Sequence, residues 1–305
     1  MTLIISGANT QNAFLVADRR FSYENGFFDD ERNKAIFFVV RDARLLVAFT
    51  GLAQLGQFQT ARWLADALTE AAQPELLIEP TLRRFVGIAT SRFATIECER
   101  RLKRLSIVMS GYWIGENPPR WCGCVISNFE RQGGDLQEAA DQFEEIRSVE
   151  ERPFTRESYF VRISGAKVPS VRPNLSEIGE LVRQRRPALA IVQKSVHTIR
   201  ELAESQGYRG SVGAQCNSIY MPRSTMGARA EYHSGTATNV VYMPDSVIMN
   251  GTMNLAARGS SIESFSPDGD PVPMTMPRVH RNAPCPCGSG QRFRDCCRRM
   301  PWRIS

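Results

Sequence analysis

The sequence predicts an α+β protein, a four-layer αββα sandwich in which two antiparallel sheets face each other and helices cover both outer faces. Short apolar runs and stretches of helical spacing follow in blocks of strands, helices, strands, helices and strands, which favours α+β over a wound parallel sheet. Short polar turns join neighbouring runs and favour antiparallel pairing. The 305 residues, 42% of them hydrophobic, are enough for one large domain and an appendage.

The first part of the chain predicts two β-hairpins followed by helices. NTQN and RDAR are polar turn sequences, and each lies between two apolar runs. The four predicted strands are residues 3–8, 13–18, 34–40 and 44–51. Beyond Gly51 the apolar residues recur at helical spacing over about 54–72, and again from Pro80 to Leu102.

The second part predicts further strands around another helical stretch. A helix is expected over about 187–204, where apolar residues again recur at helical spacing. The strands are expected over residues 105–113, 121–128, 158–164 and 214–221, and near Arg229 and Asn239. No internal repeat is visible in the sequence.

The net charge of +6 is concentrated at the C-terminal end. Residues 278–305 contain seven arginines, no lysine and one acidic residue, Asp295, so seven minus one accounts for the whole excess. A small basic module on a neutral body indicates an anionic partner, either RNA or an acidic protein surface. A solubilising end is the alternative.

Membrane and export signals are missing from the sequence. No stretch approaches the roughly 18 uninterrupted apolar residues of a membrane helix, and the first residues lack the basic start and long apolar run of a secretory signal. We therefore expect a soluble, cytoplasmic protein with no membrane partner.

Four of the eight cysteines lie close together in the basic tail, at Cys285, Cys287, Cys296 and Cys297. Without an export signal, clustered cysteines indicate metal ligands rather than disulfides. Four thiolates suit the tetrahedral coordination that zinc prefers in structural sites. A segment of about 20 residues has almost no core, so one structural zinc ion would supply its folding energy.

The string NAPCPCGSGQRFRDCC resembles the SEC-C zinc motif, known from the C-terminus of the SecA translocase ATPase. The resemblance implies that the four cysteines bind zinc and that the module recruits a partner or substrate without being catalytic. The preceding stretch is rich in Ser, Asp and Pro and lacks a period, which is typical of a linker. We expect a main domain over residues 1–258, a flexible linker over 259–280 and a zinc-binding tail over 281–305.

The residue types that suit amide hydrolysis lie within the first 51 residues. Thr2 becomes N-terminal if Met1 is removed, and it would then carry a hydroxyl together with an amine of pKa near 7.7–8.0 that can act as its general base. Lys34 opens the third strand and Asp18 closes the second, where the two can meet beside Thr2. Gly51 ends the fourth strand, where a backbone N–H can approach an oxyanion. Each residue taken singly is more often structural.

Together these residues resemble the proteasome β-subunit family of N-terminal nucleophile hydrolases. That family begins with its catalytic Thr and has an Asp 16 residues later and a Lys a further 16 residues on; Thr2, Asp18 and Lys34 keep both intervals. Arg20 matches the family's Arg after the Asp, and Gly51 matches the glycine that provides the oxyanion N–H. The resemblance covers roughly residues 2–222 and implies an αββα sandwich and a homo-oligomer.

The resemblance also assigns two serines near the terminal amine, Ser164 in ISGA and Ser211 in GSVGAQC. It departs from the family at Tyr208, where relatives usually have an Asp. Only Met1 precedes Thr2, as in bacterial relatives, which need no cleaved propeptide. While Met1 is retained, the nitrogen of Thr2 is an amide and cannot act as a base.

The substrate pocket implied by the alignment consists of Phe21, Arg32 and Phe49. An apolar wall with one guanidinium is expected to accept an acidic or amphipathic side chain of a protein or peptide substrate.

Other residues with chemical potential are expected to be structural. Cys122 and Cys124 lie on one strand without a second pair nearby, His197 falls in a helical pattern, and His233 has no nucleophile and acid at a matching spacing. Three functions remain open. They are a threonine hydrolase acting on peptides, a non-catalytic proteasome-like scaffold acting through its zinc tail, and a small-molecule amidase of the same fold.

Overall fold

A computed structural model describes residues 2–22, 28–29, 34–114, 120–131, 138–147, 158–165, 172–205, 211–223, 228–233, 240–242, 246–249, 252–257, 261–265, 271–273, 281–282, 292 and 294. Arg32, Tyr208 and the four cysteines of the tail lie outside these ranges.

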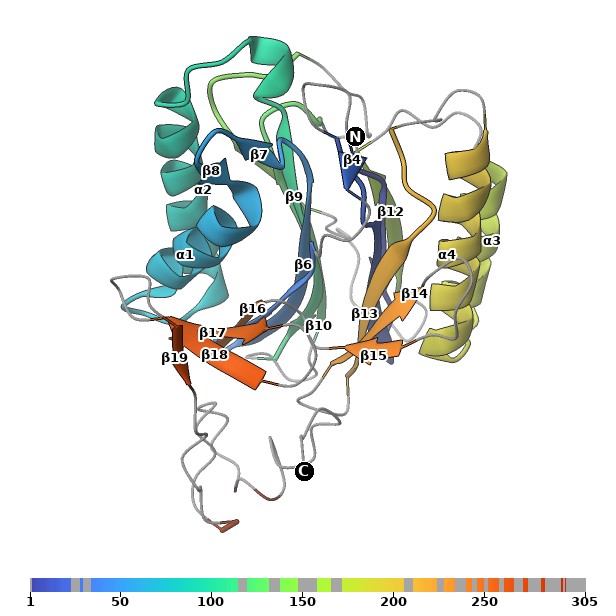
Figure 1. Ribbon diagram of the computed structural model, residues 1–305. Coiled ribbons are helices and arrows are strands. Elements are labelled where there is room, and N and C mark those ends of the chain that lie inside the picture. The colour runs from blue at the N-terminus through green and yellow to red at the C-terminus, as the bar shows by residue number, and fades with distance from the viewer. Residues whose placement is uncertain are drawn as a thin grey trace.

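Two β-sheets stack face to face, and a pair of helices covers the outer side of each, so the predicted αββα sandwich is confirmed (Figure 1). The first sheet contains, in spatial order, β12 (Phe160–Ser164), β1 (Ile4–Ala8), β2 (Asn12–Asp18), β13 (Cys216–Pro222), β14 (Arg229–His233) and β15 (Val240–Tyr242). The second contains β11 (Glu144–Arg147), β10 (Arg120–Ser127), β9 (Leu105–Trp113), β6 (Ala43–Gly51), β5 (Ile36–Val39), β16 (Ser246–Met249), β17 (Thr252–Ala257), β18 (Ser261–Phe265) and β19 (Pro271–Pro273). Among these strands β5 and β16 pair in parallel, and the other pairings are antiparallel.

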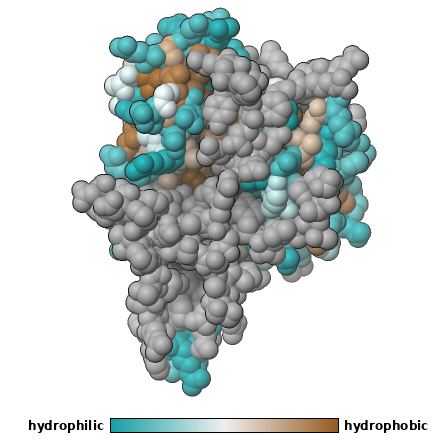
Figure 2. All heavy atoms as spheres, in the orientation of Figure 1, coloured by the Kyte–Doolittle hydropathy of each residue, from teal (hydrophilic) through white to brown (hydrophobic). Residues whose placement is uncertain are grey.

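Each helix pair buries one apolar face. Helices α1 (Thr60–Ala72) and α2 (Ile78–Ala94) pack on the second sheet, and α3 (Arg172–Arg183) and α4 (Ala188–Glu204) pack on the first. In the space-filling view, the visible part of the α3–α4 side is mainly hydrophilic, whereas a larger hydrophobic area is visible on the α1–α2 side (Figure 2). No helix in the described part of the chain is long and apolar enough to cross a membrane.

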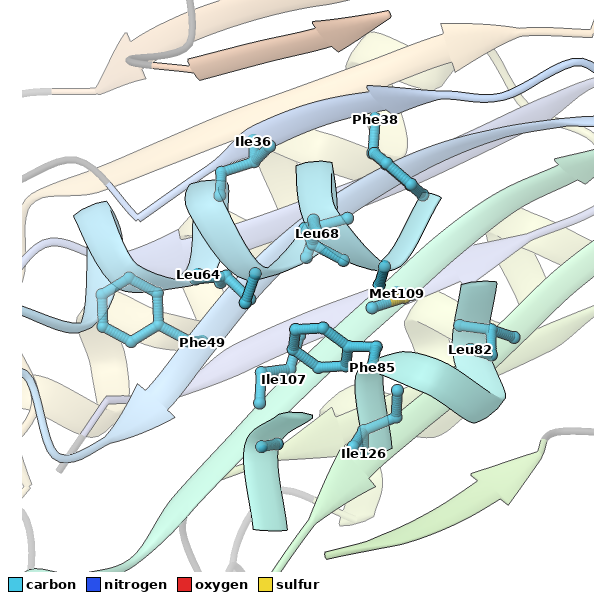
Figure 3. Close-up of a cluster of buried hydrophobic side chains, with 14 of the residues drawn as sticks. Ile36, Phe38, Phe49, Leu64, Leu68, Leu82, Phe85, Ile107, Met109 and Ile126 are labelled. Atoms are coloured by element: carbon cyan, nitrogen blue, oxygen red, sulfur yellow. The ribbon is translucent and has the colours of Figure 1, made fainter. Parts of the chain in front are cut away.

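The core follows from the alternation of side chains along the strands. In β6, Leu45, Val47 and Phe49 lie in the cluster beneath α1 and α2, whereas Leu46 and Ala48 lie between the two sheets. Figure 3 shows the first of these clusters, in which side chains from β5, β6, β9 and β10 meet those of α1 and α2. Each large apolar side chain buried in this way stabilises the fold by about 1.5–3 kcal/mol.

The first helix begins later than its apolar spacing predicts. Residues 54–59 instead form a small hairpin of β7 (Gln54–Leu55) and β8 (Phe58–Gln59). The hairpin closes where the Thr60 N–H donates to the Ala53 carbonyl at 3.0 Å. The predicted helical start was wrong because the apolar side chains of a short hairpin can pack on the same core as one helical turn does.

The second helix ends before its predicted end at Leu102. It stops at Ala94, where the Ile96 N–H donates to the Phe93 carbonyl at 3.3 Å and tightens the last turn. Ile96 is 7% exposed and still packs in the core from outside the helix, which explains the misleading spacing. A short 3-10 helix, η1 (Arg100–Leu102), precedes β9.

Several elements were not predicted. Helix α3 and strands β11, β16 and β17 lie outside the predicted elements, and β18 and β19 fall within the range expected as a linker. These last two strands pair with each other, and β18 also pairs with β17. The division of the chain into a domain, a linker and a tail stays a prediction.

Candidate active site

Antiparallel pairing of β1 with β2 brings Thr2 and Asp18 to the same end of the first sheet. Asp18 lies across from the residues that precede β1, and its backbone N–H donates to the Leu3 carbonyl at 3.1 Å. In return the Leu3 N–H donates to the Asp18 carboxylate at 2.5 Å. Thr2 is 4% exposed and Asp18 is fully buried. This end of the sandwich lies near the N-terminus in Figure 1.

Lys34 reaches the same place from the second sheet. It precedes β5 and is 2% exposed. Its ammonium donates a hydrogen bond to the Thr2 hydroxyl oxygen and another, of 2.7 Å, to the Arg20 carbonyl. The same nitrogen lies 3.7 Å from the Asp18 carboxylate. The three residues at intervals of 16 therefore converge on one buried point between the sheets.

The Asp18 carboxylate is held by several donors. Besides Leu3, the Arg20 N–H donates to it at 2.9 Å and the Gly213 N–H at 3.4 Å. Burial raises the pKa of Asp18, while the Lys34 ammonium and the Leu3 and Arg20 amides oppose that rise. Asp18 thus anchors the cation that faces the Thr2 hydroxyl. A cation in this position favours the alkoxide form of a nucleophile.

The end of β6 also contacts Thr2. The Thr50 hydroxyl is fully buried and donates to the Thr2 carbonyl at 2.7 Å. Gly51 follows at φ 107°, and a Cβ at this position would lie 2.0 Å from the Arg104 carbonyl. Only glycine fits there. The assignment of its N–H to an oxyanion stays a prediction.

Thr50→Val is expected to lower the free energy of unfolding by about 1–3 kcal/mol, because it keeps the shape of the side chain but leaves the buried Thr2 carbonyl without this donor. Urea unfolding measures the change. Thr81→Val is the matched control, because the Leu77 carbonyl that accepts from the Thr81 hydroxyl also accepts from the Thr81 N–H at 3.1 Å. Equal losses in the two variants would contradict a specific role for Thr50.

Both predicted serines lie near this point. Ser164 is 2% exposed and pairs with Ile4 in the register between β12 and β1. Ser211 is two residues before Gly213, whose N–H donates to Asp18. The neighbour of Ser164, Gly165, has φ 103°, and a Cβ on it would lie 1.9 Å from the Thr2 carbonyl oxygen. Gly165 is therefore in direct backbone contact with Thr2.

Sequence reasoning missed Thr50, Gly165 and Glu130. The Glu130 carboxylate accepts from the Gly165 N–H at 2.9 Å. None of the three has a period or spacing that would reveal it. Glu130 reads as a turn residue after a strand, and Thr50 as one more β-branched strand residue.

The pocket residues are only partly described. Phe21 and Phe49 make an edge contact with ring centroids 6.0 Å apart, and the Lys34 ammonium lies 5.0 Å from the Phe21 ring centre. Both rings are buried, at 6% and 1% exposure, in the core cluster beneath α1 and α2. The pocket assignment stays a prediction. A separate depression of about 660 Å³ lies between α1 and α2 and contains none of the predicted site residues.

The remaining residues have structural environments. Cys122 and Cys124 pack with the core beneath α1 and α2, and burial raises the pKa of Cys122 to about 12. His197 is exposed on α4 and lies 3.1 Å from Glu201. His233 is buried, with Nε2 2.8 Å from the Ser218 hydroxyl. Within the described ranges no three metal-ligating side chains gather.

Two stacked, mainly antiparallel sheets between helix pairs, with Thr2 at the end of one sheet, define the fold class as a four-layer αββα sandwich. In this chain Thr2 precedes β1, Asp18 ends β2 and Lys34 precedes β5, and the three side chains meet there.

The solved structures to which the chain is similar include three of Anbu. For Anbu (ancestral beta-subunit) from Yersinia bercovieri, identity is 12%, coverage 72% of this chain and 82% of that chain, and TM-score 0.48. An Anbu (Gly-1) mutant from Hyphomicrobium sp. strain MC1 is 13% identical, with coverage of 77% of this chain and 88% of that chain and a TM-score of 0.49. A helical assembly of the Anbu complex from Pseudomonas aeruginosa is also 13% identical, with coverage of 77% of this chain and 88% of that chain and a TM-score of 0.46.

The tail matches a separate family. Residues 281–299 match the SEC-C motif. A stretch of 30 residues, 10% of this chain, is 57% identical to protein translocase subunit SecA 1 from Rhodopirellula baltica (strain DSM 10527 / NCIMB 13988 / SH1). The chain spans only 2% of the length of that relative.

Proposed function

We propose that this protein is an N-terminal threonine hydrolase that cleaves amide bonds, chiefly of peptides, through an acyl-enzyme on Thr2. The observation that carries the proposal is the hydrogen bond from the buried Lys34 ammonium to the Thr2 hydroxyl, with Asp18 behind it. A hydroxyl inside the fold has no structural need for a buried cation, since water or a carbonyl would satisfy it at lower cost.

The mechanism uses the terminal residue as both nucleophile and base. Once Met1 is removed, the free amine of Thr2 takes the hydroxyl proton while Oγ1 attacks the amide carbonyl. Lys34 stabilises the developing negative charge on Oγ1, and the Gly51 N–H stabilises the oxyanion. The protonated terminal amine of Thr2 then gives its proton to the amide nitrogen as the C–N bond breaks. The amine product leaves, and an ester remains on Thr2. Water, deprotonated by the same amine, then hydrolyses the ester to release the acid and regenerate Thr2.

Ser164 and Ser211 are assigned to orienting this amine. Support for Ser164 comes from its burial and from its register opposite Ile4, two residues after Thr2. Support for Ser211 comes from the Gly213 N–H bonded to Asp18. Phe21, Arg32 and Phe49 are assigned to the substrate pocket, which would favour an acidic or amphipathic side chain. Cleavage of peptides that differ only in the residue whose side chain enters this pocket measures the preference. Equal cleavage of all of them would refute it.

Intact mass spectrometry tests the proposal. We expect purified protein to lack the mass of one methionine, and a β-lactone that acylates terminal threonines to add one adduct, located on Thr2 by fragmentation. Retained Met1, or a free Thr2 that gains no adduct, would contradict the hydrolase function.

The tail is proposed to hold one structural zinc ion. Cys285, Cys287, Cys296 and Cys297 provide four thiolates, the donor set that zinc takes in closed tetrahedral sites. The SEC-C match over residues 281–299 includes all four. Zinc bound there would fold the tail, and the surrounding arginines would then recruit an anionic substrate or partner, an acidic protein surface or RNA. The tail would follow a domain over 1–258 and a linker over 259–280.

Cys285→Ser is expected to reduce the zinc content from one ion per chain to none, because three thiolates bind zinc far more weakly than four. Native mass spectrometry measures the bound metal. Cys98→Ser is the matched control, since Cys98 is half-buried beside the core and outside the tail. Zinc retained by Cys285→Ser, or an absence of zinc from the unchanged protein, would refute the proposed site.

A second candidate function is a non-catalytic scaffold that acts through its tail. The observation in its favour is the burial of Thr2, at 4% exposure, with Met1 before it in the sequence. A scaffold requires that Thr2→Ala leaves partner binding intact while Cys285→Ser abolishes it.

A third candidate is an amidase for small molecules, which is distinguished by hydrolysis of non-peptide amides when peptides are not cleaved. The native mass also tests the expected homo-oligomer.

A further inference from the structure

Glu130 follows β10 in a turn that fixes its direction. The Ser127 hydroxyl accepts from the Phe129 N–H at 3.1 Å and from the Glu130 N–H at 2.8 Å. The Asn128 side chain accepts from the Leu105 N–H at 2.9 Å. These bonds tie the turn to β9, so the backbone of Glu130 is positioned independently of its carboxylate.

The carboxylate of Glu130 is 1% exposed and has an extensive set of partners. One oxygen accepts from the Gly165 N–H at 2.9 Å, and the other lies 3.6 Å from the Arg162 guanidinium. The hydroxyls of Ser106 and Ser164 lie near this carboxylate. Burial raises the pKa of Glu130, whereas Arg162, the Gly165 amide and the two hydroxyls lower it. An ionisable side chain is rarely buried unless it is paired in this way.

The partners of Glu130 lead directly to the candidate nucleophile. Ser164 ends β12, which pairs with β1 just beyond Thr2, and Gly165 follows it. A Cβ on Gly165 would lie 1.9 Å from the Thr2 carbonyl oxygen and 2.6 Å from the Thr50 hydroxyl. The Gly165 backbone is therefore packed directly against the Thr2 carbonyl, while its N–H is hydrogen-bonded to the Glu130 carboxylate.

We propose that Glu130 is a positioning residue, which holds Ser164 and Gly165 against Thr2 and thereby sets the orientation of the nucleophile. Its effect on reactivity rests on the proposed hydrolase function, whereas its effect on the placement of Thr2 does not. Glu130 contacts no substrate in this scheme and acts through the end of β12.

Two variants and a control test the role. Glu130→Ala removes every partner, and Glu130→Gln keeps an oxygen that accepts from the Gly165 N–H. Glu231→Gln is the control, because Glu231 is also buried and paired with an arginine, Arg229 at 2.8 Å, but lies three strands from β1 in the same sheet. The readouts are the rate of β-lactone acylation of Thr2 per folded molecule and hydrogen exchange over residues 2–5 and 160–165.

We expect Glu130→Ala to slow acylation at least about tenfold, because small displacements of reacting groups have large effects on rate. Exchange in both segments should become about tenfold faster, since the contact that closes them is lost. Glu130→Gln should stay within about threefold of the unchanged protein in both readouts, because the bond to Gly165 survives. It also provides the measurement if Glu130→Ala fails to fold. Glu231→Gln should change neither readout.

The outcomes separate this inference from the proposed function. Faster exchange in Glu130→Ala supports positioning even if Thr2 never reacts with the lactone, in which case the hydrolase function fails alone. Unchanged exchange overturns positioning. An unchanged acylation rate in Glu130→Ala, with Thr2 reactive, overturns it as well. Equal effects of Glu130→Gln and Glu130→Ala on exchange also overturn it, because the bond to Gly165 would then be irrelevant.

Discussion

Thr2→Ala is expected to abolish both β-lactone labelling and amide hydrolysis, a loss of at least about 1,000-fold, because it removes the hydroxyl that faces Lys34 and the acyl-enzyme cannot form. The fold should survive the change. Lys34 keeps its bond to the Arg20 carbonyl and its ion pair with Asp18. Peptide cleavage assays and intact mass measure the effect, and urea unfolding shows that the protein is still folded.

Thr2→Ser provides the positive control for this experiment. It keeps the hydroxyl oxygen that accepts from Lys34 and loses only a methyl group. Labelling should therefore persist in Thr2→Ser while it vanishes in Thr2→Ala. If Thr2→Ala still formed the adduct or cleaved peptides, the nucleophile would lie elsewhere and the proposed mechanism would be wrong.

Lys34→Ala is expected to have the largest effect on stability, a loss of about 3–5 kcal/mol in the free energy of unfolding, because it leaves the Asp18 carboxylate buried without its cation. Activity should be lost with it, since the Thr2 hydroxyl loses the ammonium that it faces. Urea unfolding at neutral pH measures the loss. Lys194→Ala is the control, because Lys194 pairs with Glu177 at the surface, where such a pair contributes about 0–1 kcal/mol.

The stability loss in Lys34→Ala should depend on pH in a defined direction. Burial already raises the pKa of Asp18 above its ordinary 3.8, and removal of the cation that opposes this shift raises it further. A folded state that binds the proton more tightly is stabilised at low pH and loses that stability as pH rises through the folded pKa. The deficit of the variant should therefore be small near pH 4 and grow towards pH 7. A deficit independent of pH would contradict the pairing of Lys34 with Asp18.

Local pattern in the sequence determined the sandwich and the convergence of Thr2, Asp18 and Lys34. Strands that are neighbours along the chain pair through short turns, so β1 with β2 and β5 with β6 could be predicted from two apolar runs and a polar turn. The spacing of 16 residues resembles a known family, and the structure brings these three side chains to one buried point. The variants above test their chemical roles.

Only the tertiary structure decided which distant residues surround that point. Thr50, Gly165 and Glu130 reach Thr2 through contacts that span dozens of residues, and such contacts leave no period in the sequence. The parallel pairing of β16 with β5 joins residues about 210 positions apart, beyond what any local pattern can report. Hydrophobic periodicity records which face of an element is buried, whereas the partner that buries it is chosen by the packing of the whole chain.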